Sequence, residues 1–279
     1  QSNATLEKQY KEEMTLRKKY WNTIEDMKGK IRVYARCRPF AKYEIERGCS
    51  PVVRFADDTT LELNTAHGLK EFAFDAVFDP ESTQGAVFED TRNLIQSCLD
   101  GYNVCIFAYG QTGSGKTFTM TGSDSLPGLT PRAITELFDG IANTKTSETK
   151  VTAYFVELYN DQVVDLLWKL ENRTAKGDGP KLDIKVDSKK MVFVKNVTTK
   201  SVGSPSDLME LFNAGNGMRH VGATKMNAES SRSHSIFSIL VESYNTTTKK
   251  TSVGKLSLVD LAGSERADKT GATAERLKE

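Results

Sequence analysis

The feature that most constrains this chain is a glycine-rich stretch that directly follows a continuous apolar run. Residues 104–109 read Val-Cys-Ile-Phe-Ala-Tyr, a run typical of a strand buried on both faces of a parallel sheet. Residues 110–117 read Gly-Gln-Thr-Gly-Ser-Gly-Lys-Thr and satisfy the pattern G-x-x-x-x-G-K-[ST]. The succession of strand, glycine-rich loop and helix predicts an α/β sheet with a phosphate-binding loop at the carboxyl end of one strand.

This loop predicts a nucleoside triphosphate site, because its glycines let successive backbone N–H groups turn toward one centre and cradle phosphate oxygens. Lys116 can reach the β- and γ-phosphates, and the Thr117 hydroxyl can bind Mg²⁺. The alternative is a glycine-rich turn without a ligand. The nucleotide-binding residues expected in the loop are Gly110, Gln111, Thr112, Gly113, Ser114, Gly115, Lys116 and Thr117.

A second buried strand is predicted to end in an acid. Residues 255–263 read Lys-Leu-Ser-Leu-Val-Asp-Leu-Ala-Gly, so Asp260 falls where the apolar run meets a turn of small residues. A carboxylate in this position holds Mg²⁺ in P-loop nucleotide hydrolases. The backbone N–H of Gly263 could then approach the γ-phosphate.

Hydroxyl groups and a guanidinium gather in residues 227–234, Asn-Ala-Glu-Ser-Ser-Arg-Ser-His. In isolation this stretch reads as a solvated loop or a phosphorylation site. Beside the P-loop and Asp260, it predicts contacts to the γ-phosphate, to Mg²⁺ and to an attacking water.

The remaining chain alternates strands and helices, which favours a sheet covered on both sides. Further strands are predicted at 31–37, 52–55, 61–63, 72–74, 150–159, 236–244 and 256–261, and helices at 83–100, 131–142 and 206–218.

Composition excludes several classes of protein. Hydrophobic residues make up 38% and charged residues 27% of the 279 residues, which is enough for a sizeable core and unlike a disordered chain. A net charge of +1 argues against a protein that wraps nucleic acid. No apolar run approaches the length of a membrane helix, and the four cysteines show no zinc-ligand spacing. We therefore expect a cytoplasmic protein with reduced thiols, no nucleic acid and no membrane insertion.

The first 28 residues are predicted to lie outside the main domain. Residues 1–4, Gln-Ser-Asn-Ala, resemble a vector-derived remnant of expression. Residues 5–28 contain no Gly or Pro and predict a helix with a partial heptad seam. The centre of the seam is polar, so a weak coiled coil and a solvated helix packed on the next domain both remain open.

Four separated motifs together give a resemblance to the kinesin motor domain. They are Arg36-Cys37-Arg38-Pro39, the loop 110–117, the stretch 227–234, and Asp260-Leu261-Ala262-Gly263-Ser264-Glu265. The resemblance begins near residue 29 and extends to the end of the chain. It implies a P-loop NTPase fold: an α/β domain at 29–279 with a mostly parallel central sheet, helices on both faces and a preceding neck helix at 5–28. It also implies that the family's C-terminal part is absent from this domain.

The resemblance assigns roles to individual residues. Arg36 and Pro39 would flank the adenine with Phe118 nearby, and Arg38 counts among the nucleotide-binding residues. Thr117, Ser231 and Asp260 would serve Mg²⁺. The catalytic set carried over is Asn227, Ser230, Ser231, Arg232, Asp260, Gly263 and Glu265. Arg232 would pair with Glu265 when the site closes, and that pair would help to align the lytic water. Because no N-K-x-D motif for guanine occurs, ATP and ADP are the expected nucleotides.

The resemblance also implies a partner and a direction. A helix that precedes the first strand looks like the kinesin-14 group, whose motors move toward microtubule minus ends, and residues 10–30 are most similar to the calmodulin-binding kinesins. This implies a microtubule-stimulated ATPase at the cytoskeleton, including the spindle. A homodimer through the neck helix and regulation by calmodulin outside this chain are compatible with it.

Two other functions were weighed against a motor. A nucleotide-binding tether without motility would be expected to have lost at least one of Lys116, Thr117, Ser231, Arg232, Asp260 and Glu265. Another P-loop enzyme would not carry the stretches 227–234 and 260–265 together. For the track, the expected basic positions are Lys181, Lys185, Lys189, Lys190 and Lys195, although an ordinary solvated face explains them equally well.

Overall fold

The computed structural model describes residues 31–144, 146–174, 179–187, 192–220 and 232–265, together with seven single residues before residue 31. The chain divides into two compact units, residues 1–82 and residues 83–279. The predicted neck helix at 5–28 falls largely outside the described residues and stays a prediction. Residues 1–4 also lie outside them.

The N-terminal unit is built from short strands. Its elements are β1 (Tyr34–Arg36), α2 (Lys42–Glu46), β2 (Val53–Phe55), β3 (Thr60–Thr65), β4 (Gly68–Ala73) and β5 (Ala76–Phe78). Strand β1 pairs with β5 in parallel. Strands β2, β3 and β4 form an antiparallel sheet.

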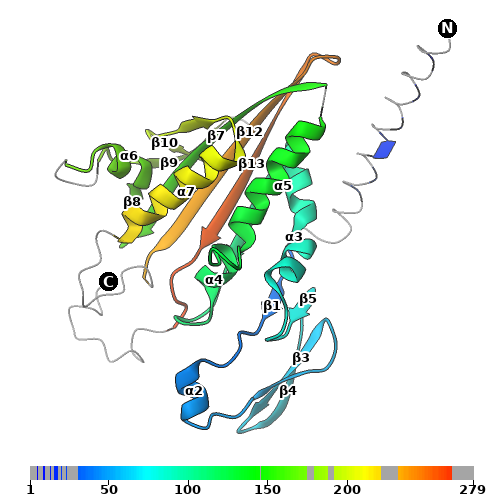
Figure 1. Ribbon diagram of the computed structural model, residues 1–279, viewed down its shortest axis with the longest axis vertical. Coiled ribbons are helices and arrows are strands. Elements are labelled where there is room, and N and C mark those ends of the chain that lie inside the picture. The colour runs from blue at the N-terminus through cyan, green and yellow to red at the C-terminus, as the bar shows by residue number, and fades with distance from the viewer. Residues whose placement is uncertain are drawn as a thin grey trace. The chain divides into compact units, whose positions relative to one another are not determined.

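The C-terminal unit contains the larger sheet, with strand order β11-β7-β12-β13-β6 and β8 paired to β7 (Figure 1). Its strands are β6 (Asn103–Ala108), β7 (Ser147–Tyr159), β8 (Gln162–Asp165), β11 (Lys200–Val202), β12 (His234–Asn245) and β13 (Lys250–Asp260). A separate hairpin joins β9 (Asp183–Val186) to β10 (Val192–Lys195). The helices are α3 (Gln84–Leu99), α4 (Lys116–Met120), α5 (Leu129–Asn143), α6 (Leu166–Glu171) and α7 (Pro205–His220).

The expectation of a mostly parallel sheet is wrong for the described strands. Among the described strands of this larger sheet, only β6 and β13 pair in parallel, whereas β7, β8, β11, β12 and β13 make antiparallel pairs. For the β7–β8 and β12–β13 pairs the cause is the short connection, since a turn of a few residues can join only antiparallel neighbours. Asn160 and Asp161 form the two-residue turn between β7 and β8, and both have positive φ, 47° and 57°, as a type I′ hairpin turn requires.

Helices α3, α5 and α7 lie side by side on one face of this sheet (Figure 1). Three rings form the centre of that layer: Phe155 of β7 and Phe237 of β12 have centroids 5.1 Å apart, and Phe212 of α7 stacks on Phe155 at 5.6 Å. All three side chains are buried. Burial of these apolar side chains fixes α7 on the sheet.

The prediction of helices on both faces is met on one face by the described residues and stays a prediction for the other. On the opposite face, Tyr154 and Val156 of β7 cluster with Leu182 and with Val194 of β10. In the part of the chain that the structure describes, this face is therefore packed by the β9–β10 hairpin and its approach. A two-stranded hairpin with an apolar side can cover such a face as a helix can.

Strand β6 differs from its prediction in burial. Val104 is buried, whereas Phe107 is 59% exposed and the following Tyr109 is 74% exposed. The apolar run predicted a strand covered on both faces, but among the described residues helices pack on only one face of β6. Strand β6 is also the last strand in the sheet order. In the described structure, its side chains therefore have neighbouring strand residues on the β13 side only.

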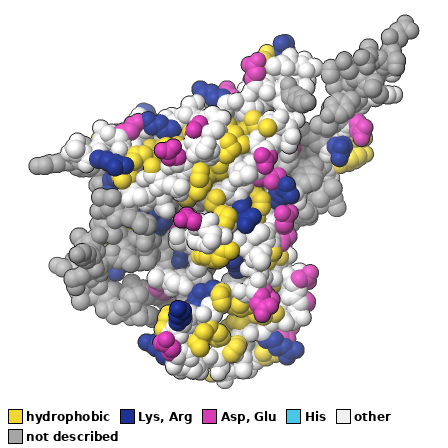
Figure 2. All heavy atoms as spheres, in the orientation of Figure 1, with side chains coloured by type: hydrophobic (Ala, Val, Ile, Leu, Met, Phe, Trp, Pro, Cys, Tyr) yellow, Lys and Arg dark blue, Asp and Glu magenta, His cyan; other side chains and the backbone are white. Residues whose placement is uncertain are grey.

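The sequence located most of the long elements correctly and missed several short ones. The helices predicted at 83–100, 131–142 and 206–218 are confirmed as α3, α5 and α7. The short elements that were not predicted are α2, α6, β5, β8, β9, β10 and β11. Among the described helices, none is both long and apolar enough to cross a membrane. On the face shown in Figure 2, acidic and basic side chains intermingle and no single basic patch stands out.

Candidate functional site

The P-loop connects β6 to α4 and depends on glycine conformations. Gly113 and Gly115 have φ values of 78° and 96°, in the left-handed region that side chains other than glycine rarely adopt. Gly115 is the residue before the first turn of α4, so its conformation directs the chain from the loop into the helix. Lys116 and Thr117 are therefore held at the start of α4, as the motif predicted.

The ammonium group of Lys116 is folded back on its own loop. Its Nζ donates hydrogen bonds to the carbonyl oxygens of Gly110 at 2.9 Å and Gln111 at 3.0 Å. Carbonyl oxygens carry only partial charge, so phosphate oxygens would be stronger acceptors for this group. The lysine can exchange its loop contacts for a phosphate.

Thr117 and Asp260 meet across the site although 143 residues separate them. The Thr117 hydroxyl donates to Asp260 Oδ2 at 2.7 Å. The pairing that brings them together is the parallel register of β6 and β13, in which Asp260 lies opposite Ala108. The carboxyl end of β13 is thereby placed beside the loop that follows β6, as the sequence predicted.

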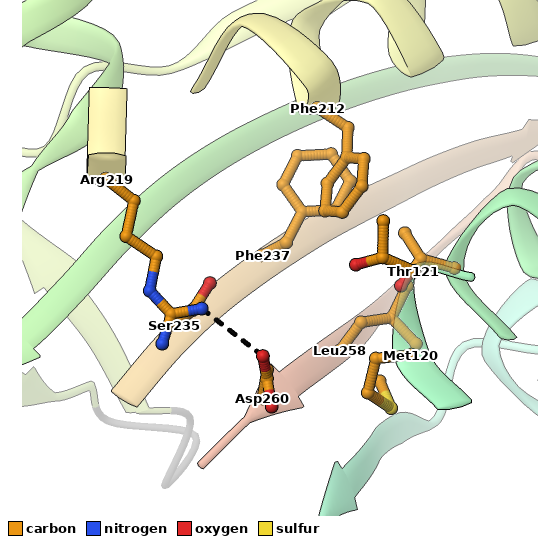
Figure 3. Close-up of a pocket in the computed structure, with 9 residues that line it drawn as sticks. Met120, Thr121, Phe212, Arg219, Ser235, Phe237, Leu258 and Asp260 are labelled. Atoms are coloured by element: carbon orange, nitrogen blue, oxygen red, sulfur yellow. Dashed lines mark hydrogen bonds and ion pairs between the residues drawn. The ribbon is translucent and has the colours of Figure 1, made fainter. Parts of the chain in front are cut away.

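Asp260 is buried and makes a second contact. Arg219, in the last turn of α7, places Nη1 3.3 Å from the same Oδ2 (Figure 3). The other carboxylate oxygen, Oδ1, is buried and has no hydrogen-bond partner among the described residues. Buried polar atoms are rarely left unpaired, so Oδ1 marks a position where a ligand atom or water is expected.

The chain after β13 stays close to the P-loop. The Ser264 N–H donates to the Gly110 carbonyl at 3.1 Å, and the Ala262 N–H donates to Nδ1 of His234 at 3.1 Å. Gly263 lies in a tight passage, because a Cβ there would collide with Thr112 Oγ1 and with the Glu265 carboxylate. Only glycine fits between these groups without a local shift.

Glu265 contacts the P-loop directly. Its Oε2 accepts a hydrogen bond from the Thr112 backbone N–H at 2.8 Å. Hydrogen bonds from the Thr112 side chain and from its backbone N–H lower the pKa of the Glu265 carboxyl, because they favour the ionised form. The Glu265 carboxylate thus accepts a hydrogen bond from one of the N–H groups that the sequence predicts for phosphate binding. The predicted pair of Glu265 with Arg232, whose side chain is exposed, stays a prediction.

Three predicted adenine-side residues belong to the N-terminal unit. Arg38 pairs with Glu44 through its Nη2 at 2.6 Å and its Nη1 at 2.7 Å, and the Arg38 hydrogen bond lowers the pKa of Glu44 to about 2. Arg36 is half-buried, and desolvation lowers its pKa. Pro39 accepts a hydrogen bond from Arg38 at 3.0 Å. Phe118 is 43% exposed on α4 of the other unit.

Some site residues lie outside the described chain, and others were missed. Asn227, Ser230 and Ser231 fall outside the described residues. Sequence reasoning missed Arg219 and Glu157, and it quoted His234 within a motif without giving it a role. His234 could have been suspected from its place two residues after Arg232, whereas Arg219 lies one residue beyond the helix predicted at 206–218 and belongs to no motif.

Comparisons with known proteins agree with this geometry. The family model described as "Kinesin motor domain" matches residues 36–279. Kinesin-like protein KIN-14E of Arabidopsis thaliana is 50% identical over 278 residues, covering 99% of this chain and 22% of the relative. Kinesin-like protein KIN-14I of Oryza sativa subsp. japonica is 50% identical over 280 residues, covering 98% and 22%. The chain therefore spans about a fifth of the length of these curated relatives.

Solved structures show the same fold. The C-terminal motor and motor homology domain of Kar3Vik1, fused to a synthetic heterodimeric coiled coil, aligns with a TM-score of 0.81 at 37% identity, covering 96% of this chain and 69% of that chain. A fast kinesin aligns with a TM-score of 0.79 at 37% identity, covering 87% and 68%. With the family model matching most of the sequence, the chain belongs to the kinesin motor domain family.

Proposed function

We propose that this chain is the ATP-hydrolysing part of a microtubule motor and that it couples loss of the γ-phosphate to movement of residues 261–265. The observation that carries the proposal is that both acids at the ends of one short segment contact the P-loop. Asp260 accepts from Thr117 at 2.7 Å, and Glu265 accepts from the Thr112 N–H at 2.8 Å. Binding or loss of a phosphate at the P-loop would therefore alter the contacts of both Asp260 and Glu265.

Mg²⁺ is expected with the nucleotide, and the residues present fit it. Thr117 offers a hydroxyl and Asp260 a carboxylate, the oxygen donors that Mg²⁺ takes in proteins. The unpartnered, buried Asp260 Oδ1 supports an additional polar ligand there. Thr117 and Asp260 would hold the ion, with Ser231 as the further ligand carried over from the family. When bound, the ion neutralises charge on the phosphate oxygens.

Nucleotide binding would replace two contacts that the P-loop makes in the structure. The Lys116 ammonium would leave the Gly110 and Gln111 carbonyls for the phosphates, since charged acceptors bind it more strongly. Glu265 would leave the Thr112 N–H, because its carboxylate repels a phosphate in the same cradle. Glu265 would then be available to pair with Arg232 and to position the attacking water.

The direction and the assembly of the motor are proposed from resemblance. The relatives quoted above carry KIN-14 names, and the kinesin-14 group supports movement toward microtubule minus ends. A gliding assay on polarity-marked microtubules with the complete protein measures the direction, and movement toward the plus end would contradict it. A homodimer through residues 5–28 and calmodulin regulation outside this chain stay predictions.

Steady-state hydrolysis of Mg-ATP tests the proposed function. Phosphate release is measured with and without polymerised tubulin, using unpolymerised tubulin as the control. We expect polymerised tubulin to stimulate hydrolysis at least about tenfold, with salt reducing the stimulation because tubulin is acidic. ATP binding without hydrolysis under any of these conditions would contradict the ATPase assignment.

A further inference from the structure

Arg219 is the most completely enclosed arginine at the site, although no motif of the sequence contains it. Its side chain is 3% exposed and comes from the last turn of α7. Its three nitrogen atoms all have partners: Nη1 lies 3.3 Å from Asp260 Oδ2, Nη2 donates to the Ser233 carbonyl at 2.9 Å, and Nε lies 3.3 Å from Ser233 Oγ. Glu157 of β7 adds a second acid at 3.6 Å from Nε.

These partners come from two strands and from the residue that precedes a third. Asp260 ends β13, Glu157 lies near the end of β7, and Ser233 directly precedes β12. Ser233 follows Arg219 by fourteen residues, so the guanidinium joins the end of α7 to the start of β12. A buried guanidinium with three fixed directions can hold these groups in one arrangement.

The contact also determines which oxygen of Asp260 remains available. Oδ2 already accepts from Thr117 at 2.7 Å and faces Arg219 at 3.3 Å. Both interactions use the same oxygen, so rotation of the carboxylate would break both. The other oxygen, Oδ1, is buried and has no hydrogen-bond partner within the described part of the chain. In Figure 3, Arg219 and Asp260 face each other at the edge of a small cavity, whose other walls include Phe237 and Ser235.

We propose that Arg219 is a positioning residue for the Mg²⁺-dependent nucleotide site: it orients Asp260 so that Oδ1 is presented, and it fixes Ser233 beside that carboxylate. Arg219 touches neither nucleotide nor ion in this role, which rests on the proposed function of the site. A lysine could supply one charge but could not reach Asp260, Ser233 Oγ and the Ser233 carbonyl together. The conservative variant should therefore restore only part of the effect.

Release of a fluorescent ADP analogue from the purified protein tests this role at a series of free Mg²⁺ concentrations and in EDTA. In Arg219→Gln, we expect the Mg²⁺ concentration that half-maximally slows ADP release to rise about tenfold, as for other groups that orient metal ligands. Arg219→Lys should be intermediate. In EDTA, both variants should release ADP at the rate of the unmodified protein, because orientation of a metal ligand then has no effect.

Arg92→Gln is the matched control. Arg92 also pairs with a carboxylate, Glu136 on α5, at 2.9 Å, but its side chain is half-exposed on the outer helices. This variant should keep the Mg²⁺ dependence of the unmodified protein. Thermal unfolding of each variant identifies misfolding, and if Arg219→Gln does not fold, the comparison of Arg219→Lys with the unmodified protein carries the test.

Two results would overturn the positioning role. One is an unchanged Mg²⁺ half-point in the folded Arg219 variants. The other is faster ADP release that persists undiminished in EDTA, which would indicate a general loss of structure. If the unmodified protein retains no ADP at any Mg²⁺ concentration, the nucleotide site itself is contradicted, and that outcome is distinct from a failure of Arg219 alone.

Discussion

Asp260 and Glu265 are acids five residues apart that both contact the P-loop, yet their surroundings differ. Asp260 is 8% exposed and is held by Thr117 and Arg219. Glu265 lies in an exposed part of the chain, where its described partner is Thr112 of the P-loop. A buried carboxylate with a buried counter-charge is costly to disturb, whereas an exposed contact can be exchanged for water or a ligand. The comparison teaches that segment 260–265 is anchored by buried contacts at Asp260, whereas the exposed contact of Glu265 at its other end can be exchanged when a ligand binds.

The largest expected effect is on the anchored end. Asp260→Ala would remove the acceptor of Thr117 and one of the two carboxylates beside the buried Arg219, with Glu157 remaining at 3.6 Å. Because one counter-charge is kept, the cost should lie at the low end of that for breaking a buried ion pair, about 3 kcal/mol in the free energy of unfolding. Urea unfolding followed by circular dichroism measures it. Glu265→Ala is the matched variant and should leave the midpoint almost unchanged. Equal destabilisation by both substitutions would remove the distinction between the two acids.

Lys116→Ala should give the next largest effect, this time on binding and not on stability. Loss of charge-assisted hydrogen bonds to phosphate should weaken nucleotide affinity about 100-fold. Titration with a fluorescent nucleotide measures the affinity. Lys150→Ala, which removes an exposed lysine of β7, serves as the control and should bind normally. Normal affinity in Lys116→Ala would place the phosphates elsewhere.

Glu265→Ala should separate binding from hydrolysis. We expect ATP affinity within about threefold of the unmodified protein and hydrolysis slower by about 100-fold, as for the loss of a positioned acid–base group. Single-turnover phosphate release measures the chemical step. Glu89→Ala on α3 is a control for an exposed glutamate. If Glu265→Ala and Lys116→Ala lose binding equally, the two roles are assigned wrongly.

The smallest effect concerns pH. Because the Glu265 pKa is lowered from its ordinary value of 4.5, its contact with Thr112 should be fully present above that value and should be lost as the pH falls through the lowered pKa. Carbon NMR of the glutamate carboxyl group follows this titration. Thr112→Val removes the hydroxyl and should move the midpoint upward toward 4.5. An unmoved midpoint would show that the Thr112 hydroxyl has no influence.

The sequence predicted the position of Asp260 beside the P-loop better than it predicted the sheet around them. The P-loop and Asp260 could be placed together because each follows an apolar strand, and parallel pairing then brings the two strand ends to one edge. The predicted sheet direction was wrong in part because the four-residue connection at 246–249 between β12 and β13 can join only antiparallel strands. The one-sided exposure of Phe107 could not be read from an apolar run, since burial depends on what packs against each face.

Arg219 illustrates what local patterns cannot supply. Its partners Glu157, Ser233 and Asp260 lie at least fourteen residues from it along the chain, and their convergence depends on the order of strands in the sheet. Polar residues near a helix end ordinarily read as solvated. Only the packing of α7 on β7 and β12 identifies this arginine as an internal one.

The hairpin of β12 and β13 has a mechanical consequence. The two strands pair continuously from Ser235 opposite Asp260 to Asn245 opposite Lys250, a length of about 35 Å at the usual rise per residue. Because no bulge interrupts this pairing, we expect the hairpin to bend less along its length than at its two ends. We therefore expect a tilt at Asp260 to be carried along the paired strands toward the turn at 246–249, at the other end of the hairpin.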